Sequence, residues 1–274
     1  MDEKRAMVNG VVVRNRPVAP DHFLLTVRMP RGFAQPLPGQ FVMIRPSRGS
    51  DPLLARPLSV FGFRLHDDHG VLEILCRVAG RVTAILANLK PGEELAILGP
   101  IGRGFTLPVG ISQVIFVAGG VGVAPLAYLL HSDLLASKAG REIRKDFYLG
   151  ARSAGLLAGV ERLRDFCELG ICTDDGSQGY HGPVTAMLHR EIHRFNPEKT
   201  IIYACGPTPM IRALRSLLRE HPIPCQVSLE ERMACGLGAC LGCAVAIRGP
   251  GGNREYRRVC HDGPVFDLRE VVFV

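Results

Sequence analysis

The sequence contains no tryptophan, and aromatic residues make up only 6% of its 274 residues. Proteins that bind single-stranded nucleic acid stack bases on aromatic side chains, so this scarcity argues against such a function. A block of basic residues is missing as well: the net charge of +7 comes from 33 lysines and arginines, scattered along the chain, against 26 acidic residues. We therefore expect no nucleic-acid partner.

The sequence also has little that would direct it to a membrane. Its first ten residues, MDEKRAMVNG, contain no apolar signal-peptide core. Residues 105–130 carry no charge, over a length that could cross a bilayer, but Pro108, Gly119, Gly120 and Pro125 interrupt them. We expect a buried strand, a loop and a helix there, and hence a cytoplasmic protein without a membrane partner.

Two different rhythms of secondary structure follow each other along the chain. Residues 1–108 contain short β-rich runs at 8–13, 22–27, 40–44 and 71–78, bounded by proline and glycine, with one helical run at 83–89. This pattern predicts a small antiparallel β-barrel. From about residue 112 each predicted strand is followed by a helix, which predicts a parallel sheet with helices on both faces. The expected strand and helix pairs are 114–118 with 124–137, 146–150 with 160–166, 169–173 with 183–193, and 200–204 with 209–220.

The remaining segment is dense in glycine and cysteine. The length predicts two domains with a small appendix, so we expect a multi-domain β plus α/β protein. Its expected parts are a barrel over 1–108, a nucleotide-binding α/β domain over 109–225 and a small C-terminal domain over 226–274.

Four of the nine cysteines have a spacing that points to a cofactor. Cys235, Cys240, Cys243 and the distant Cys260 follow the Cys-x4-Cys-x2-Cys…Cys pattern of plant-type [2Fe–2S] centres. Small residues between them let the backbone wrap closely and aim amide N–H groups at the sulfurs. A zinc site fits less well, because structural zinc usually joins two short Cys-x2-Cys knuckles. The spacing therefore predicts an iron–sulfur cluster, with zinc or unrelated free thiols as alternatives.

Two glycine-containing turns are expected at the carboxyl ends of strands in the predicted parallel sheet. Such turns let a phosphate approach backbone N–H groups at a helix N-terminus. Either could be a plain turn, but together they flank the crevice where open sheets bind ligands. We expect Cys205 to line a nicotinamide site there, with simple strand-end packing as the alternative. The predicted dinucleotide-binding residues of these turns are Gly119, Gly120, Gly122, Cys205, Gly206 and Pro207.

Two carboxylates, Asp174 and Asp175, follow the third strand of the predicted parallel sheet. A carboxylate at this position accepts hydrogen bonds from the adenosine-ribose hydroxyls and repels a 2′-phosphate, which favours NAD(H) over NADP(H). An Asp-rich turn that binds only its own backbone explains the pair equally well.

Three barrel residues have the chemistry to hold a flavin nucleotide. Arg56 could pair with a phosphate, Ser59 could hydrogen-bond a flavin ring edge, and Thr83 could cap the barrel's helix beside a pyrophosphate. Spacing alone leaves this assignment open, because an exposed arginine before a proline is unremarkable.

These motifs together resemble the ferredoxin–NADP reductase superfamily, in which a flavin barrel precedes a pyridine-nucleotide domain. Residues 228–243 and 259–266 narrow the resemblance to the electron-transfer subunits of NAD-linked, heterotetrameric dihydroorotate dehydrogenases, and it extends over nearly the whole chain. The resemblance implies a [2Fe–2S] cluster on the four cysteines, NAD(H) as co-substrate and FAD in the barrel. The implied FAD-binding residues are Arg56, Pro57, Leu58, Ser59, Leu75, Cys76, Arg77, Val82 and Thr83. In two of these the chain departs from the family, which often has glycine at the position of Val82 and an aromatic residue at that of Cys76.

The resemblance also implies a partner and a role in the de novo synthesis of pyrimidines (UMP). The partner would be an FMN-containing dihydroorotate dehydrogenase catalytic subunit, with two copies of each chain. Electrons would pass from its FMN to the cluster, to FAD and to NAD+. FAD stands between the cluster and NAD+ because it can accept single electrons and can also transfer a hydride. No side chain of this sequence need act as an acid or base, and we expect no dihydroorotate turnover by the chain alone.

Two other kinds of protein remain as alternatives. One is a related flavin and iron–sulfur subunit of a hydrogenase, a sulfite reductase or a ferredoxin:NADP oxidoreductase. In the last group one cluster ligand can be aspartate, and Cys235 argues against it. The other is a regulatory binding module with a zinc-bound tail and no redox turnover.

Overall fold

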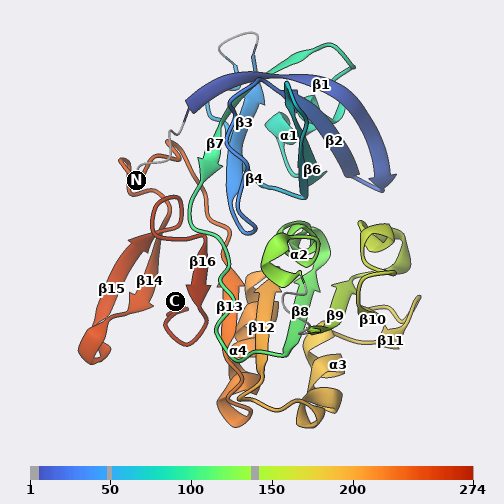
Figure 1. The fold of residues 1–274 in the computed structure, drawn as a ribbon, viewed down its shortest axis with the longest axis vertical. Coiled ribbons are helices and arrows are strands. Elements are labelled where there is room, and N and C mark those ends of the chain that lie inside the picture. The colour runs from blue at the N-terminus through green and yellow to red at the C-terminus, as the bar shows by residue number, and fades with distance from the viewer. Residues whose placement is uncertain (1–5, 48–50, 137–141, 274) are drawn as a thin grey trace.

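The barrel region forms one curled antiparallel sheet. The computed structural model describes residues 6–47, 51–136 and 142–273, and Figure 1 shows this sheet above the rest of the chain. Its seven strands lie in the order β4-β3-β7-β1-β2-β6-β5, and every pairing is antiparallel. The strands are β1 (Ala6–Ala19), β2 (His22–Met29), β3 (Phe41–Pro46), β4 (Arg56–Ser59), β5 (Gly62–Leu65), β6 (Gly70–Arg77) and β7 (Glu94–Ile101).

Alternating apolar side chains give the barrel its core, as a pleated strand requires. Leu25 and Val27 of β2 and Ile74 of β6 are fully buried on the inner face. Helix α1 (Arg81–Ala87) closes one end and contributes Val82 and Leu86 to the same core. The sequence therefore predicts this part well, since the four predicted strands and the helix are all present.

The second sheet is parallel except at one edge. Its order is β11-β10-β9-β8-β12-β13-β16, and only the pairing of β13 with β16 is antiparallel. Its strands are β8 (Gln113–Gly119), β9 (Arg144–Ala151), β10 (Glu168–Thr173), β11 (Tyr180–His181), β12 (Thr200–Cys205), β13 (Cys225–Ser228) and β16 (Val265–Asp267).

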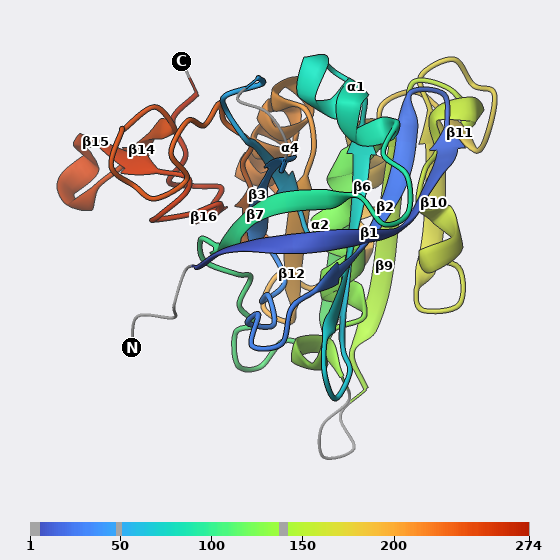
Figure 2. The ribbon, with the colours of Figure 1, turned by 90° about the horizontal axis from the view of Figure 1, so that it is seen from above.

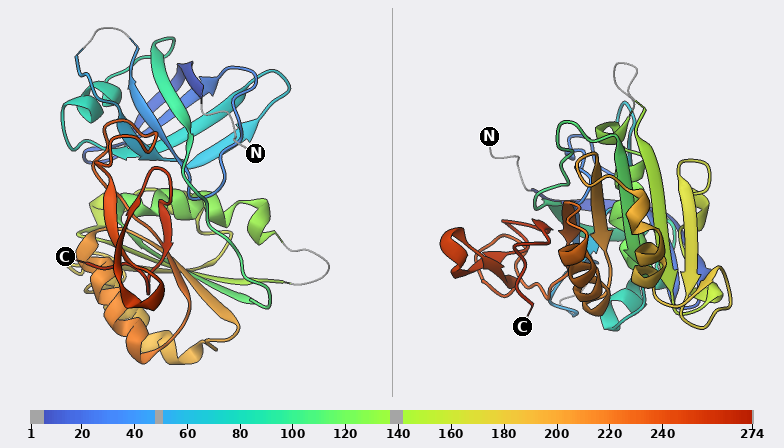
Figure 3. Two further views of the ribbon diagram at one scale, coloured as in Figure 1. Left: turned by 90° about the vertical axis from the view of Figure 1, so that its left-hand side faces the viewer. Right: turned by 90° about the horizontal axis from the view of Figure 1, so that it is seen from below.

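Helices cover both faces of this sheet, as expected. Helix α2 (Val123–Leu130) lies between the sheet and the barrel, where it packs with Phe116 of β8 and Phe61 of the barrel. Helices α3 (Val184–Glu191) and α4 (Thr208–Glu220) cover the opposite face, against Ile115 and Val117. Figure 3 shows α2 in green between the two sheets and the orange helices beyond.

One predicted helix, at 160–166, is wrong. Only a 3₁₀ turn, Val160–Arg162, forms there, after Gly159 with φ of +78°. The Arg162 guanidinium of this turn reaches across to the barrel, where it pairs with Glu73 and lies over the Phe61 ring at 4.9 Å. The predicted helix 124–137 is also too long. Its regular part ends at Leu130, and residue 137 lies outside the described residues.

The C-terminal segment lies beside the barrel and the parallel sheet. A hairpin of β14 (Ala244–Arg248) and β15 (Arg254–Arg258) projects to one side, and β16 then returns to the edge of the parallel sheet. In Figure 2 this segment stands next to β3 and β7. Shorter 3₁₀ turns complete the described chain at Gly120–Gly122, Asp133–Leu135, Ala154–Leu156, Ile192–Arg194 and Pro250–Gly252. No helix in the described ranges is long and apolar enough to span a bilayer.

Candidate functional site

A cleft of about 700 Å³ opens where the barrel meets the carboxyl ends of the parallel strands. The barrel contributes His22 and Arg77 to its wall, and the parallel-sheet region contributes the rest. Six of the eight residues predicted to bind NAD line this cleft: Gly119, Gly120, Gly122, Asp174, Gly206 and Pro207. The topology brings them together, because β8 and β12 are parallel neighbours whose carboxyl ends share one edge.

The two glycine turns press against each other so closely that side chains do not fit. A Cβ on Gly122 would lie 2.2 Å from the Cys205 carbonyl oxygen, which belongs to the backbone. A Cβ on Gly119 would lie 2.8 Å from the side chains of Met210 and Pro207. The glycines therefore let the two turns pack directly on each other, and both turns line the cleft.

The two predicted ribose-binding carboxylates have different surroundings. Asp174 lines the cleft together with Arg152. The Asp175 carboxylate instead accepts hydrogen bonds from the Ser177 hydroxyl, at 2.5 Å, and from the Ser177 N–H, at 3.0 Å, and these hydrogen bonds lower its pKa. Asp175 thus makes its hydrogen bonds within its own turn, and Asp174 is the one of the two carboxylates that lines the cleft.

Cys205 is fully buried behind the cleft at the end of β12. Burial, and to a smaller degree the nearby Glu230 carboxylate, raise the pKa of its thiol well above the usual value. Glu230 itself lines the cleft just past β13, and the surrounding protein raises its pKa although it is open to solvent there. The Glu230 carboxyl group, with a raised pKa, therefore lies in the cleft wall near the buried, neutral Cys205 thiol.

The residues implied for the flavin are distributed over three elements of the barrel. Arg56, Pro57, Leu58 and Ser59 form β4, an edge strand paired on one side only, with β3. Leu75, Cys76 and Arg77 end β6, and Val82 and Thr83 begin α1. The guanidinium groups of Arg56 and Arg77 are exposed. They supply the positive charge that a flavin pyrophosphate requires, so the donor set fits the group.

Val82 and Cys76, the two residues that depart from the family pattern, both pack in the barrel core. Val82 is 1% exposed and Cys76 is 3% exposed, and both belong to the barrel core. Burial, with a contribution from Glu230, raises the pKa of the Cys76 thiol to about 12. The Thr83 hydroxyl accepts the N–H groups of Ala79, at 2.9 Å, and Gly80, at 3.1 Å, and so caps α1 as expected.

The four cysteines of the predicted cluster lie in two pairs. The thiol of Cys243 lies 3.3 Å from that of Cys260, and both residues are buried. Cys235 and Cys240 form the second pair, in a more open loop where the Cys240 side chain helps to lower the pKa of Cys235. Within the described residues, no three His, Cys, Asp or Glu side chains are grouped as ligands of one metal ion. Two thiol pairs suit a centre with two irons, which needs two cysteine ligands on each iron.

The loop that carries Cys235 surrounds this sulfur with amide N–H groups. The Leu237 N–H donates to Cys235 Sγ at 3.4 Å. This bond and those from the N–H groups of Cys240 and Ala239 lower the pKa of Cys235 to about 6. Cys260 differs, because burial and the adjacent Cys243 raise its pKa to about 12. The lowered pKa of Cys235 thus favours the thiolate, the form that binds metal, whereas the raised pKa of Cys260 favours the thiol.

The cysteine loop packs directly on the strand next to the predicted flavin strand. Gly236 has φ of +68°, and a Cβ there would lie 2.8 Å from the Met43 side chain of β3. Met43 pairs in turn with Pro57 of β4. The cysteine loop and the predicted flavin strand thus lie next to the same residue of the barrel.

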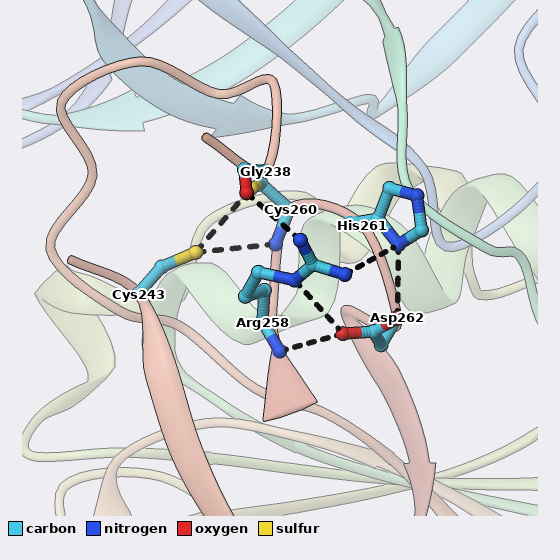
Figure 4. Close-up of polar contacts among 6 residues, drawn as sticks. All are labelled: Gly238, Cys243, Arg258, Cys260, His261 and Asp262. Atoms are coloured by element: carbon cyan, nitrogen blue, oxygen red, sulfur yellow. Dashed lines mark hydrogen bonds and ion pairs between the residues drawn. The ribbon is translucent and has the colours of Figure 1, made fainter. Parts of the chain in front are cut away.

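A set of polar contacts around Arg258 joins the cysteine loop to the end of β15 (Figure 4). Arg258 Nη1 donates to the Gly238 carbonyl at 2.9 Å, and its Nε and backbone N–H donate to Asp262 Oδ2 at 3.3 and 2.9 Å. Burial alone would raise the pKa of Asp262, but hydrogen bonds from His261 and Arg258 outweigh it and lower the pKa to about 2. Asp262 is therefore an anion that holds the Arg258 cation in place.

The sequence predicted no role for several residues of the cleft wall, among them His22, Arg152 and Glu230. Glu230 lies in the stretch that carried the family resemblance, and its place directly after a strand of the parallel sheet was the available signal. His22 had none, because the approach of the barrel to the sheet is a tertiary contact.

Comparison with known proteins bears on both the tail and the whole chain. Residues 230–272 match the family model for the iron–sulfur cluster binding domain of dihydroorotate dehydrogenase B. The chain is 40% identical over 257 residues to the dihydroorotate dehydrogenase B (NAD(+)) electron transfer subunit of Desulforamulus reducens, covering 93% of this chain and 94% of that protein.

Solved structures share the fold. A structure of an NADH-dependent reduced ferredoxin–NADP oxidoreductase, studied for flavin-based electron bifurcation, superposes with a TM-score of 0.79 at 27% identity, over 99% of this chain and 91% of that one. The ferredoxin NADP+ reductase of Neisseria gonorrhoeae, solved with bound FAD and NADP, gives 0.66 at 18% identity, over 80% and 92%. The fold is thus that of the ferredoxin–NADP reductases, as the sequence predicts. The chain belongs to the family of electron transfer subunits of the NAD-dependent dihydroorotate dehydrogenase B.

Proposed function

We propose that this chain carries electrons between an FMN-containing dihydroorotate dehydrogenase catalytic subunit and NAD+, in a cytoplasmic heterotetramer of two chains of each kind. The family membership supports the catalytic partner. FMN on the partner, the number of subunits, the compartment and NAD(H) as the dinucleotide are our proposals. The division of the chain into 1–108, 109–225 and 226–274 is also a proposal, and it follows the two sheets and the cysteine tail except where β16 returns to the parallel sheet.

FAD is proposed to bind along β4, the end of β6 and the start of α1. Arg56 and Arg77 would hold the pyrophosphate, Ser59 the ring edge, and Pro57, Leu58, Leu75, Cys76, Val82 and Thr83 would complete the site. When bound, FAD supplies the exchange between hydride transfer and single-electron transfer, and the cluster supplies single-electron transfer. The chain's own residues bind these cofactors, orient them and shield them from solvent.

NAD is proposed to bind in the cleft, with its pyrophosphate on the glycine turns of β8 and β12 and its adenosine ribose on Asp174. The proposal is supported by the glycine turns at Gly119–Gly122 and at Gly206, which line the cleft at the carboxyl ends of β8 and β12. Gly206 and Pro207 belong to the β12 turn that lines the cleft, whereas Asp175 and Cys205 are proposed to support the site from outside the cleft wall. Asp175 shapes the turn that presents Asp174, and buried Cys205 supports Gly206 and Pro207 from behind.

The cluster is proposed to take Cys235 and Cys240 on one iron and Cys243 and Cys260 on the other, following the two thiol pairs. The observation that carries the whole assignment is the contact of Gly236 with Met43, which pairs with Pro57 of the flavin strand. Through it the cysteine loop lies one strand away from the proposed flavin site.

Comparing the isolated chain with the reconstituted complex tests this function. The chain purified anaerobically should show flavin and iron–sulfur absorption and should oxidise NADH with ferricyanide, but should form no orotate from dihydroorotate. Adding the catalytic subunit should give orotate formation coupled to NAD+ reduction. Orotate formed by the chain alone would contradict the assignment. A complex that reduces ferredoxin with NADH but forms no orotate would favour the related oxidoreductase function instead.

A further inference from the structure

The cysteine loop depends on one peptide group whose two ends serve different partners. The Gly238–Ala239 peptide presents its N–H, from Ala239, to Cys235, and its carbonyl, from Gly238, to Arg258 Nη1 at 2.9 Å. Because a trans peptide is planar, with its C=O and N–H pointing in opposite directions, fixing the carbonyl also fixes the N–H. The contact with Arg258 therefore determines where the Ala239 N–H points.

The backbone conformation of Gly238 is not fixed by the residue itself. Gly238 has φ of +83°, a conformation that glycine leaves easily, and its own N–H donates to Cys260. Successive N–H groups, from Gly238 and Ala239, thus serve sulfurs of the two different cysteine pairs. A rotation of the Gly238–Ala239 peptide would turn the Ala239 N–H away from Cys235 and would break the contact of its carbonyl with Arg258.

Arg258 is itself held rigidly. Asp262 Oδ2 accepts its Nε and its backbone N–H, and Nη2 lies 3.4 Å from His261 Nδ1. The guanidinium therefore bridges the end of β15, the turn that follows Cys260 and the cysteine loop, as Figure 4 shows. A planar guanidinium can donate in several directions, whereas a lysine ammonium at the same place is a single point.

We propose that Arg258 is a positioning residue that sets the orientation of the Gly238–Ala239 peptide, and through it the amide–sulfur hydrogen bond that the cluster ligand Cys235 receives from Ala239. The proposal rests on the assignment of the cluster to the four cysteines. Hydrogen bonds to the sulfurs and local charge set the potential of an iron–sulfur centre, and residues that orient the ligands affect how tightly the metal is held. Arg258 thereby influences both properties without touching iron.

The test compares Arg258→Met, Arg258→Lys and Asp262→Asn in the full-length holoprotein, with Arg257→Met as the matched control. Arg257 is the adjacent residue of the same strand, is exposed and contacts Glu255 only at 3.5 Å. Neighbouring residues of a strand point to opposite faces. The control thus removes the same charge one position away.

Three measurements are made on each variant. They are the rate of iron loss to a chelator, the midpoint potential of the cluster, and hydrogen exchange of the amides 237–240 in the iron-free protein. In Arg258→Met we expect iron loss and amide exchange to be faster by about 10-fold or more, and the potential to be lower. Asp262→Asn should change all three less, Arg258→Lys should restore them in part, and Arg257→Met should match the wild type.

Wild-type values of iron loss and potential in Arg258→Met would overturn the proposal. If that variant loses its fold, seen as loss of FAD and of NADH:ferricyanide activity, Arg258→Lys and Asp262→Asn decide: wild-type values in both would also overturn it. Absence of a cluster from the wild-type protein would instead contradict the ligand assignment, and amide exchange in the iron-free protein would then judge the link from Arg258 to Gly238 by itself.

Discussion

The dinucleotide cleft and the cysteine loop are built in opposite ways. The cleft consists of backbone turns at the ends of two paired parallel strands, and Gly122 lies against the carbonyl of buried Cys205. The cysteine loop has glycines with positive φ, and one arginine side chain fixes its central peptide. A site made from a strand ladder is formed before its ligand arrives. A site made from a loop and four thiols becomes rigid only when metal joins its parts.

Removing a cluster ligand should have the largest effect and should separate the two sites completely. In Cys243→Ser we expect iron and acid-labile sulfide to be lost, and NAD+-linked orotate formation by the complex to fall by about 100-fold or more, because the cluster needs all four thiolates. NADH:ferricyanide activity should stay near the wild-type value, because the cleft does not depend on the cluster. Iron analysis and the two assays on one preparation measure this.

The matched control for that variant is Cys167→Ser. Cys167 is half-buried, and its thiol donates to the Leu163 carbonyl at 3.2 Å, a bond that serine can keep. Cluster content and both activities should be unchanged. Equal loss of iron in the two variants would show that a general loss of stability, rather than ligation, removes the cluster.

A side chain added at Gly122 should disturb the packing of the turns that line the cleft and leave the cluster in place. A Cβ in Gly122→Ala would meet the Cys205 carbonyl at 2.2 Å. We expect a loss of about 1–3 kcal/mol in the free energy of unfolding and a higher KM for NADH. Gly155→Ala, where no atom lies within 4 Å of the added Cβ, should be near neutral. Denaturant unfolding and NADH:ferricyanide kinetics test this, and similar results for the two variants would refute the proposed close packing.

The two aspartates allow a finer test within the cleft. Asp174→Ser should reduce the preference for NADH over NADPH by about 10-fold, the equivalent of roughly 1.4 kcal/mol, because this carboxylate lines the cleft in which we propose that NAD binds. Asp175→Ser should change the preference little, since Asp175 binds Ser177. The ratio of kcat/KM for the two dinucleotides measures both effects. A larger change in Asp175→Ser would reverse the assignment.

Glu230→Gln should have the smallest effect, one that depends on pH. Loss of hydration in the folded protein raises the pKa of Glu230 above the usual value of 4.5, so its charged form lowers the stability at neutral pH. The free energy of unfolding should therefore be higher in the variant than in the wild type at neutral pH. The difference should shrink as the pH falls through the raised pKa toward 4.5. Urea unfolding at several pH values, without nucleotide, checks this, and a difference that grows on acidification would contradict it.

The sequence predicts the parts of this protein whose pattern is local. The alternation of apolar residues around Leu25 and Val27 and the succession of strands and helices after residue 112 identify the two sheets. The cysteine spacing predicts a cluster, and the family match over 230–272 agrees with it. The glycine turns at Gly119 and Gly206 were located for the same reason, since strand–glycine–helix is a local signal.

What the sequence could not give depends on contacts between distant segments. The apolar residues of 160–166 suggested a helix, but Arg162 is drawn to Glu73 of the barrel and only a turn forms. The roles of Asp174 and Asp175 could not be distinguished from the sequence, because only the folded turn shows that Ser177 donates its hydrogen bonds to Asp175. The pairing of β16 with β13 joins segments far apart in sequence, and no periodicity reports it.

The central claim is that the cleft and the cysteine cluster belong to one electron path within this chain. The most direct test is anaerobic addition of NADH to the isolated protein, followed by low-temperature electron paramagnetic resonance. We predict the signal of a reduced [2Fe–2S] cluster in the wild type, and in Cys243→Ser only bleaching of the flavin absorption. A wild-type protein that holds its cluster, bleaches its flavin with NADH and never shows the cluster signal, although dithionite produces it, would contradict the account.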